Sequence, residues 1–137
     1  LELRVREQCR TAMLVAEHLQ QHPKVKRVLY PGLPTHTGHD IAKRQMQGGF
    51  GAMLSVEIDA DFESTKNVVA STQLFQLAVS LGAVESLISQ PASMSHASYD
   101  REDRLANGIH DGLIRLSIGL EHVDDLVEDL DQALSNL

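Results

Sequence analysis

Residues 111–121 read Asp111-Gly-Leu-Ile-Arg-Leu-Ser-Ile-Gly-Leu-Glu121, and their pattern predicts the architecture. Side chains alternate between the two faces of a strand, so Ile114 and Ile118 would share an apolar face with the leucine between them. Arg115 and Ser117 would occupy the opposite face. Directly afterwards, residues 123–137 carry the best amphipathic helix pattern of the chain. A strand with one apolar face, followed by such a helix, predicts helices packed on one side of a sheet.

Outward from this stretch, strands and helices mix along the chain with short connections. Residues 52–58 alternate as a half-buried strand does, residues 25–30 predict a second strand, and the apolar segment 74–89, broken at Gly82, predicts short strands. The other patterns predict helices over 1–20, stopped by Pro23; over 37–46, with Thr37 and Asp40 as a capping box; over 62–72, with Asp61 near its start; and over 100–107, ended by Gly108. We therefore expect one α+β domain over residues 1–137, a two-layer fold whose mostly antiparallel sheet is covered by helices.

Composition and charge narrow the classes of partner. The chain has 137 residues, is 42% hydrophobic and carries a net charge of −7, so it can bury a core and disfavours nucleic acid or an anionic membrane as a partner. No apolar run approaches the roughly 18 residues that a membrane span needs. The single cysteine, Cys9, rules out an internal disulfide and indicates a cytoplasmic location. The chain opens at Leu1 inside a helical pattern without a methionine, and we expect a fragment of a longer protein.

Arg115 is the first candidate for a functional side chain. An arginine in the middle of an apolar strand is costly unless its charge is paired. Its guanidinium fork matches a carboxylate with two parallel hydrogen bonds, so the carboxylate of a ligand is one interpretation. The alternative is an internal salt bridge to one of the 19 acidic side chains, which is the commoner role of such arginines.

Ser80 and the histidines are further candidates. Ser80 precedes a glycine turn at Gly82, where a backbone can approach a ligand closely, although an ordinary turn explains the same residues. His36 and His39 form the one close histidine pair, and the other histidines are scattered. Because a zinc site needs three or four ligands, we expect no metal site.

Three groups of short motifs run from Tyr30 to Leu134. They are Tyr30-Pro-Gly-Leu-Pro-Thr-His-Thr-Gly-His39 with Gly48-Gly-Phe-Gly51; Ser80-Leu-Gly82 with Glu85-Ser-Leu87 and Met94-Ser-His-Ala97; and Leu113-Ile-Arg-Leu-Ser-Ile-Gly-Leu-Glu121 with Asp129-Leu-Asp-Gln-Ala-Leu134. Each motif is weak alone. Together they resemble the C-terminal domain of the Cys/Met-metabolism family of pyridoxal-phosphate enzymes, of the cystathionine β- or γ-lyase or methionine γ-lyase type.

The resemblance implies the C-terminal small domain of a fold-type I enzyme and assigns roles to four residues. In the family, the arginine of the R-L-S-x-G-x-E run grips the substrate α-carboxylate, and this arginine is Arg115 here. Ser80 and Leu81 of the S-L-G run would line the same pocket, and Ser95, usually threonine, would lie near the cofactor lysine. Pyridoxal 5′-phosphate and the catalytic groups would belong to an N-terminal domain missing from this chain. We therefore expect no catalytic and no cofactor-binding residue within it.

The resemblance also implies an assembly and a connection. The family forms homotetramers with active sites shared between subunits, and residues 1–22 would be the helix that connects the two domains. Ser64-Thr65-Lys66 is similar to the run that carries the cofactor Schiff base in some pyridoxal enzymes. Lys66, however, lies on the flank of a predicted amphipathic helix, so we expect it to be a surface lysine.

The subtype stays open from the sequence. Many γ-lyases and γ-synthases of the family have glutamate just before S-L-G, and this chain has Val79. The leading expectation is the substrate-binding domain of a lyase that eliminates a sulfur-bearing group from cystathionine or methionine, inactive as a fragment. The alternatives are a cystathionine γ-synthase-type transferase, which performs γ-replacement on an activated homoserine, and a non-catalytic domain for amino-acid binding or assembly.

Overall fold

The sheet is built around β5 (Leu113–Ser117), the strand predicted from residues 111–121. The computed structural model describes residues 1–137 and arranges five strands in the order β1-β2-β5-β4-β3. β5 pairs antiparallel with both β2 (Met53–Ile58) and β4 (Leu87–Ser89), and β1 (Val25–Leu29) pairs antiparallel with β2. Only β3 (Gln76–Leu77) runs parallel to its neighbour, β4. The expected mostly antiparallel sheet is confirmed.

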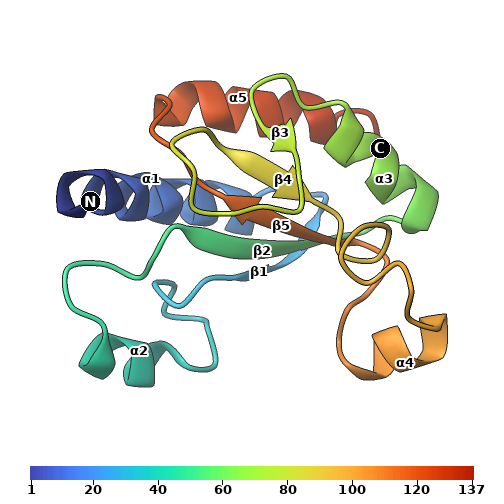
Figure 1. The fold of residues 1–137 in the computed structure, drawn as a ribbon, viewed down its shortest axis with the longest axis horizontal. Coiled ribbons are helices and arrows are strands. Elements are labelled where there is room, and N and C mark those ends of the chain that lie inside the picture. The colour runs from blue at the N-terminus through green and yellow to red at the C-terminus, as the bar shows by residue number, and fades with distance from the viewer.

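Three helices form a layer over one face of this sheet. They are α1 (Glu2–Gln20), α3 (Phe62–Ala70) and α5 (Val123–Leu134). α1 contacts β1, β2 and α5, while α3 contacts β5 and α5. Figure 1 shows the short helices α2 (His39–Gln45) and α4 (Arg101–Ala106) standing apart, on the side of the view opposite α5. The predicted two-layer α+β fold is confirmed.

The core lies between this helix layer and the inner face of the sheet. Alternate residues of the two central strands point into it, and Leu54, Val56, Ile114 and Leu116 are all at most 4% exposed. Burying a side chain of this size stabilises a fold by about 1.5–3 kcal/mol. The apolar stripe predicted for the last helix is present, since Leu126, Leu130, Ala133 and Leu134 join the same core. The pleat of β5 therefore fixes which of its side chains remain available on the outer face.

α1 is a core helix of this domain. Ala12, Val15 and Ala16 are fully buried against the sheet and α5, whereas Leu1 and Leu3 are 90% and 85% exposed. The helix ends at Gln20, before Pro23, as predicted. The connecting role expected for residues 1–22 stays a prediction, and the structure adds that most of the helix packs within these 137 residues.

Three local expectations are wrong, and one of them is the end of α3, which stops at Ala70, two residues earlier than predicted. The capping box at Thr37 and Asp40 does not form, because Gly38 is the N-cap of α2 and no side chain caps this helix. His39 Nδ1 instead donates to the Pro31 carbonyl oxygen at 2.8 Å, which ties the first residue of α2 to the preceding turn. The first strand ends at Leu29, one residue earlier than predicted. By contrast, Asp61 caps α3 as expected and accepts from the Ser64 N–H at 2.8 Å.

Candidate functional site

Arg115 stands at the middle of β5, on the face opposite the helix layer. In the sheet register, Ser55 of β2 and Ser89 of β4 lie directly across from it on either side. Both neighbours have short side chains, which leaves room for the long arginine side chain above the sheet. The predicted alternation is confirmed, because Ile114 and Leu116 are buried while Arg115 is only partly buried.

The Arg115 guanidinium has no anionic partner in the chain. Five other arginines form ion pairs, among them Arg27 with Glu57 and Arg104 with Asp111. Arg115 instead donates a single hydrogen bond, from Nη2 to the Ser80 carbonyl oxygen at 3.1 Å. The internal salt bridge that the sequence left open is therefore wrong. Since a guanidinium carries five N–H donors, most of them remain free for a planar anion such as a carboxylate.

The Ser80 carbonyl belongs to a loop, residues 78–86, whose first turn is held by β5. The Gly82 N–H donates to Ser117 Oγ at 2.9 Å. Gly82 has a φ of +74°, in the left-handed region, where a residue with a Cβ atom is disfavoured by roughly 1–2 kcal/mol. Ser117 of the R-L-S-x-G-x-E motif thus fixes the turn at Gly82 of the S-L-G motif. Arg115 lies two residues before Ser117, on the same face of β5. The contact between Gly82 and Ser117 therefore brings the Ser80 carbonyl within reach of Arg115.

Glu121 holds the other end of the same loop. Its Oε1 accepts from the Ser86 N–H at 2.7 Å, and its Oε2 accepts from the Ser86 hydroxyl at 2.8 Å. The Ser86 hydroxyl oxygen in turn accepts from the Gly119 N–H at 2.8 Å. A Cβ atom on Gly119 would collide with the Val84 carbonyl oxygen, so only glycine fits there. Alternate residues from 115 to 121 therefore position one loop next to one free guanidinium.

Of the other predicted site residues, Ser80 and Leu81 lie in this loop and Ser95 does not. Ser80 meets Arg115 through its main chain, and its hydroxyl makes no hydrogen bond within the chain. Leu81 is 58% exposed and offers an apolar surface next to Ser80. The Ser95 hydroxyl is hydrogen bonded with His96 Nδ1 at 2.8 Å, and no hydrogen bond joins Ser95 to Arg115 or to the loop.

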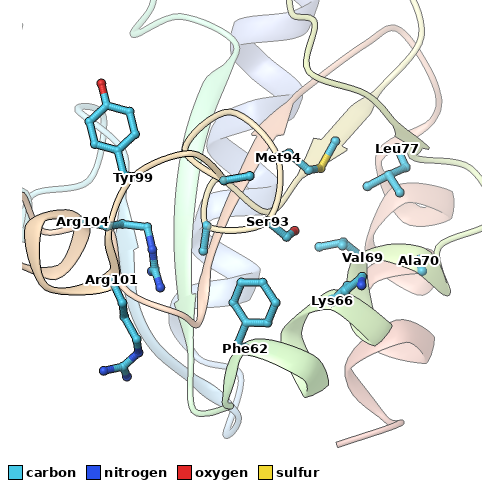
Figure 2. A pocket seen from close by; sticks show the side chains of 12 residues that line it. Phe62, Lys66, Val69, Ala70, Leu77, Ser93, Met94, Tyr99, Arg101 and Arg104 are labelled. Atoms are coloured by element: carbon cyan, nitrogen blue, oxygen red, sulfur yellow. The ribbon is translucent and has the colours of Figure 1, made fainter.

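A cavity of about 440 Å³ opens elsewhere on the surface, between α3 and the segment that leads into α4. Figure 2 shows Phe62 and Lys66 of α3 on one side of it and Tyr99 and Arg104 on the other. None of the predicted substrate-binding residues lines this cavity. Lys66 is exposed, as expected, whereas a lysine that carries a Schiff base has to be desolvated. These residues do not fit a pyridoxal-phosphate site.

Three of the histidines bond to three different partners. His39 contacts the Pro31 carbonyl, His18 Nε2 lies 2.8 Å from Asp131 Oδ1, and His110 Nδ1 lies 2.6 Å from Glu57 Oε1. No three His, Cys, Asp or Glu side chains form a group that could hold a metal ion. Among the helices, none has both the length and the apolar character needed to cross a membrane.

The clamp formed by Ser86, Gly119 and Glu121 is the part of the site that the sequence pattern does not reveal. Glu121 appears there only as a motif letter, without a role. The available signal is that the alternation of 115 and 117 continues through 119 and 121, past the last apolar residue of the strand. Ser86, which contacts residues 119 and 121, lies 33 and 35 residues before them along the chain. Patterns in neighbouring residues do not show such a contact.

Comparison with known proteins first places the fold. The structure superposes on cystathionine gamma synthase from Xanthomonas oryzae pv. oryzae, solved in complex with aminoacrylate and cysteine, with a TM-score of 0.90 and 48% sequence identity. The match covers 98% of this chain and 34% of that one. Residues 1–135 match the family described as Cys/Met metabolism PLP-dependent enzyme. The chain belongs to this family.

Two curated relatives carry different activities. The L-methionine gamma-lyase of Fusobacterium nucleatum subsp. polymorphum is 52% identical over 136 residues, which is 99% of this chain and 34% of that protein. The cystathionine beta-lyase of Coxiella burnetii is 54% identical over 134 residues, which is 98% of this chain and 34% of that protein. The chain therefore spans about a third of the length of these relatives.

Proposed function

We propose that these residues form the substrate-binding domain of a pyridoxal-phosphate-dependent enzyme of sulfur amino-acid metabolism, in which Arg115 binds the substrate α-carboxylate. The observation that carries the proposal is the unpaired guanidinium. The chain holds 19 acidic and 12 basic side chains, yet Arg115 contacts no acid and is bonded only to a carbonyl oxygen. A partly buried charge without a partner is costly, which supports a ligand carboxylate as the missing partner.

The chemical contribution of this domain would be binding and orientation. Two parallel hydrogen bonds from Arg115 would fix the plane of the carboxylate and, through it, the direction of the bonds at the substrate Cα. Leu81 would cover the apolar side of the substrate next to the Ser80 turn. The cofactor would be held by residues outside this chain, because Lys66 and its surroundings do not fit it. Ser95 near the cofactor and a homotetrameric, cytoplasmic enzyme remain part of the proposal.

For the reaction, we favour elimination of a sulfur-bearing group from cystathionine or methionine. Relatives named L-methionine gamma-lyase and cystathionine beta-lyase support a lyase. A protein named cystathionine gamma-synthase 1, chloroplastic, from Arabidopsis thaliana is also 48% identical over 134 residues, so γ-replacement is the alternative. Val79, at the position where many γ-lyases and γ-synthases carry glutamate, favours a β-lyase or a methionine γ-lyase.

The full-length protein with Arg115→Ala tests the carboxylate assignment. We expect KM to rise and kcat to fall, because both binding and orientation are lost. Losing a buried charge-paired contact typically costs roughly 2–5 kcal/mol, so kcat/KM should fall by about two to three orders of magnitude. Arg115→Lys should recover only part of it, since an ammonium lacks the fork. Near-wild-type kinetics in a correctly folded Arg115→Ala protein would end the assignment.

A product assay decides the reaction. The full-length enzyme is supplied with cystathionine, with methionine, and with cysteine plus an activated homoserine. Pyruvate from cystathionine identifies β-elimination, and 2-oxobutyrate identifies γ-elimination. Cystathionine formed in the third mixture identifies the synthase. No product in any mixture, from a protein that holds pyridoxal phosphate, contradicts the proposed function and leaves the non-catalytic alternative.

A further inference from the structure

Gln8 of α1 is a buried polar side chain that reaches the candidate site from the helix layer. It is 2% exposed and lies 75 residues before Ala83 of the 78–86 loop along the chain. Its Nε2 donates to the Ala83 carbonyl oxygen at 2.8 Å and to the Ile118 carbonyl oxygen at 2.8 Å. A side-chain amide has two N–H donors, so both are used, one on each segment that borders the site.

The two acceptors identify what Gln8 holds. Ala83 directly follows the glycine turn of the loop, and Ile118 directly follows Ser117, whose hydroxyl binds the Gly82 N–H. Gln8 therefore joins the two segments from the core side, at the point where Ser117 joins them from the outer side. Without its amide, the Ser80–Gly82 turn would keep the Ser117 contact at Gly82, and the next contact along the loop would be the Val84 carbonyl oxygen, which accepts from the Leu120 N–H at 2.8 Å. A displaced turn would also displace the carbonyl that orients Arg115.

We infer that Gln8 is a positioning residue for the carboxylate site. It does not touch the ligand, and it acts through the loop whose Ser80 carbonyl orients the Arg115 guanidinium. The identity of the ligand rests on the proposed function, whereas the effect on the loop does not. α1 thereby contributes a polar contact to the site in addition to its apolar face.

The chain offers a matched control on the same helix. Thr11 is 1% exposed, lies nearly one turn further along α1, and its hydroxyl has no hydrogen-bond partner. Thr11→Val removes a buried polar atom without breaking a hydrogen bond. Gln8→Met keeps the length of the side chain and removes both donors. Gln8→Asn keeps the amide but shortens its reach by one methylene, so it is the milder variant.

The experiment measures KM, kcat and the exchange rate of the Gly82 amide hydrogen in the full-length protein. Gln8→Met should raise KM for the amino-acid substrate about tenfold, with a smaller change in kcat, and should speed Gly82 exchange by at least a similar factor. Gln8→Asn should fall between wild type and Gln8→Met, and Thr11→Val should match wild type in all three quantities. If Gln8→Met does not fold, Gln8→Asn decides the matter.

Two results separate this inference from the proposed function. Unchanged KM and unchanged Gly82 exchange in a folded Gln8 variant, with only the melting temperature lowered, would show a purely structural residue and overturn the inference. If Arg115→Ala raises KM in the same assay while the Gln8 variants leave KM and Gly82 exchange unchanged, the role of Gln8 is overturned and the proposed function stays intact. A normal KM in Arg115→Ala would overturn the proposed function, and Gly82 exchange would still report whether Gln8 positions the loop.

Discussion

Two arginines of this chain differ in whether an acidic side chain pairs with them. Arg104 is 4% exposed and is paired with an acid, because its Nη2 donates to Asp111 Oδ1 at 2.6 Å, while its Nη1 donates to the Ile109 carbonyl oxygen at 2.7 Å. Arg115 has one hydrogen bond to a carbonyl and no acid. Both are arginines at partly apolar positions, so their surroundings alone decide which of them has donors to spare.

The Arg104–Asp111 pair leads to a prediction on pH. The hydrogen bond from Arg104 holds the pKa of the Asp111 carboxyl below its ordinary value, burial opposes this, and Arg101 adds to the lowering. A lowered pKa in the folded state means that the pair stabilises fully above the unfolded pKa, about 3.9, and that this contribution is lost as the pH falls through the folded pKa.

Urea unfolding of the wild type and of Asp111→Asn at several pH values checks this. Asp111→Asn should lower the free energy of unfolding by about 3 kcal/mol near pH 7, because it leaves the nearly buried Arg104 charge unpaired. The difference between the two proteins should stay constant down to about pH 4 and shrink below it. A difference that grows on acidification would contradict the assignment.

For the residues of the candidate site, the sequence predicts the orientation of Arg115 but not its contacts. The alternation of side chains in one short strand predicts which face of the sheet Arg115 lies on, and the structure confirms this prediction. That its contact is the Ser80 carbonyl, and that no acid reaches it, does not follow from any local pattern. The loop and the strand are 35 residues apart, and their register depends on the Ser117 and Glu121 contacts, which form only when the sheet is assembled.

At the level of helices, the two predicted N-terminal caps have opposite outcomes. Asp61 caps α3 with a hydrogen bond to the Ser64 N–H, and this bond is the main reason why the pKa of Asp61 is lowered. Thr37 makes no such contact, because α2 begins after Gly38. Threonine and aspartate are both residue types that commonly cap the N-terminus of a helix. His39, the first residue of α2, is hydrogen bonded to the Pro31 carbonyl oxygen, and this contact across a turn is not visible in the four residues on which a capping prediction rests.

This difference is testable with a pair of substitutions. Asp61→Ala should lower the free energy of unfolding clearly, because it removes the N-cap hydrogen bond to the Ser64 N–H. Thr37→Ala, in an exposed turn, should change it by no more than about 0.5 kcal/mol. Chemical denaturation of the two variants beside the wild type measures both. Equal losses would mean that Thr37 does cap α2 in solution.

For the molecule as a whole, the proposed carboxylate-binding surface lies apart from the one lysine that stands in a cofactor-like run. The free arginine and its loop lie at β5, while the sole lysine in a cofactor-like run lies on the exposed flank of α3, beside a cavity that none of the predicted site residues lines. The family and the fold could be predicted from motifs spread over the whole chain. The specific reaction could not, because relatives with different activities share the same scaffold.

The 137-residue chain alone should therefore not retain pyridoxal phosphate. After mixing with the cofactor and dialysis, we expect no imine absorbance band, because water has free access to Lys66 and would hydrolyse any imine formed there. Lys66→Ala serves as the matched variant. A band that survives dialysis in the wild type and disappears in Lys66→Ala would contradict this prediction.

The strand order β1-β2-β5-β4-β3 also determines when the sheet can be completed while the ribosome synthesises the chain. The pairs β1-β2 and β3-β4 touch each other only through β5, which the ribosome delivers near the end of these residues. Until residue 117 has emerged, the nascent chain holds two strand pairs with exposed edges and an incomplete apolar layer. A nascent chain arrested before residue 113 should consequently bind chaperones and be digested by proteases, while one that extends past residue 134 should resist both.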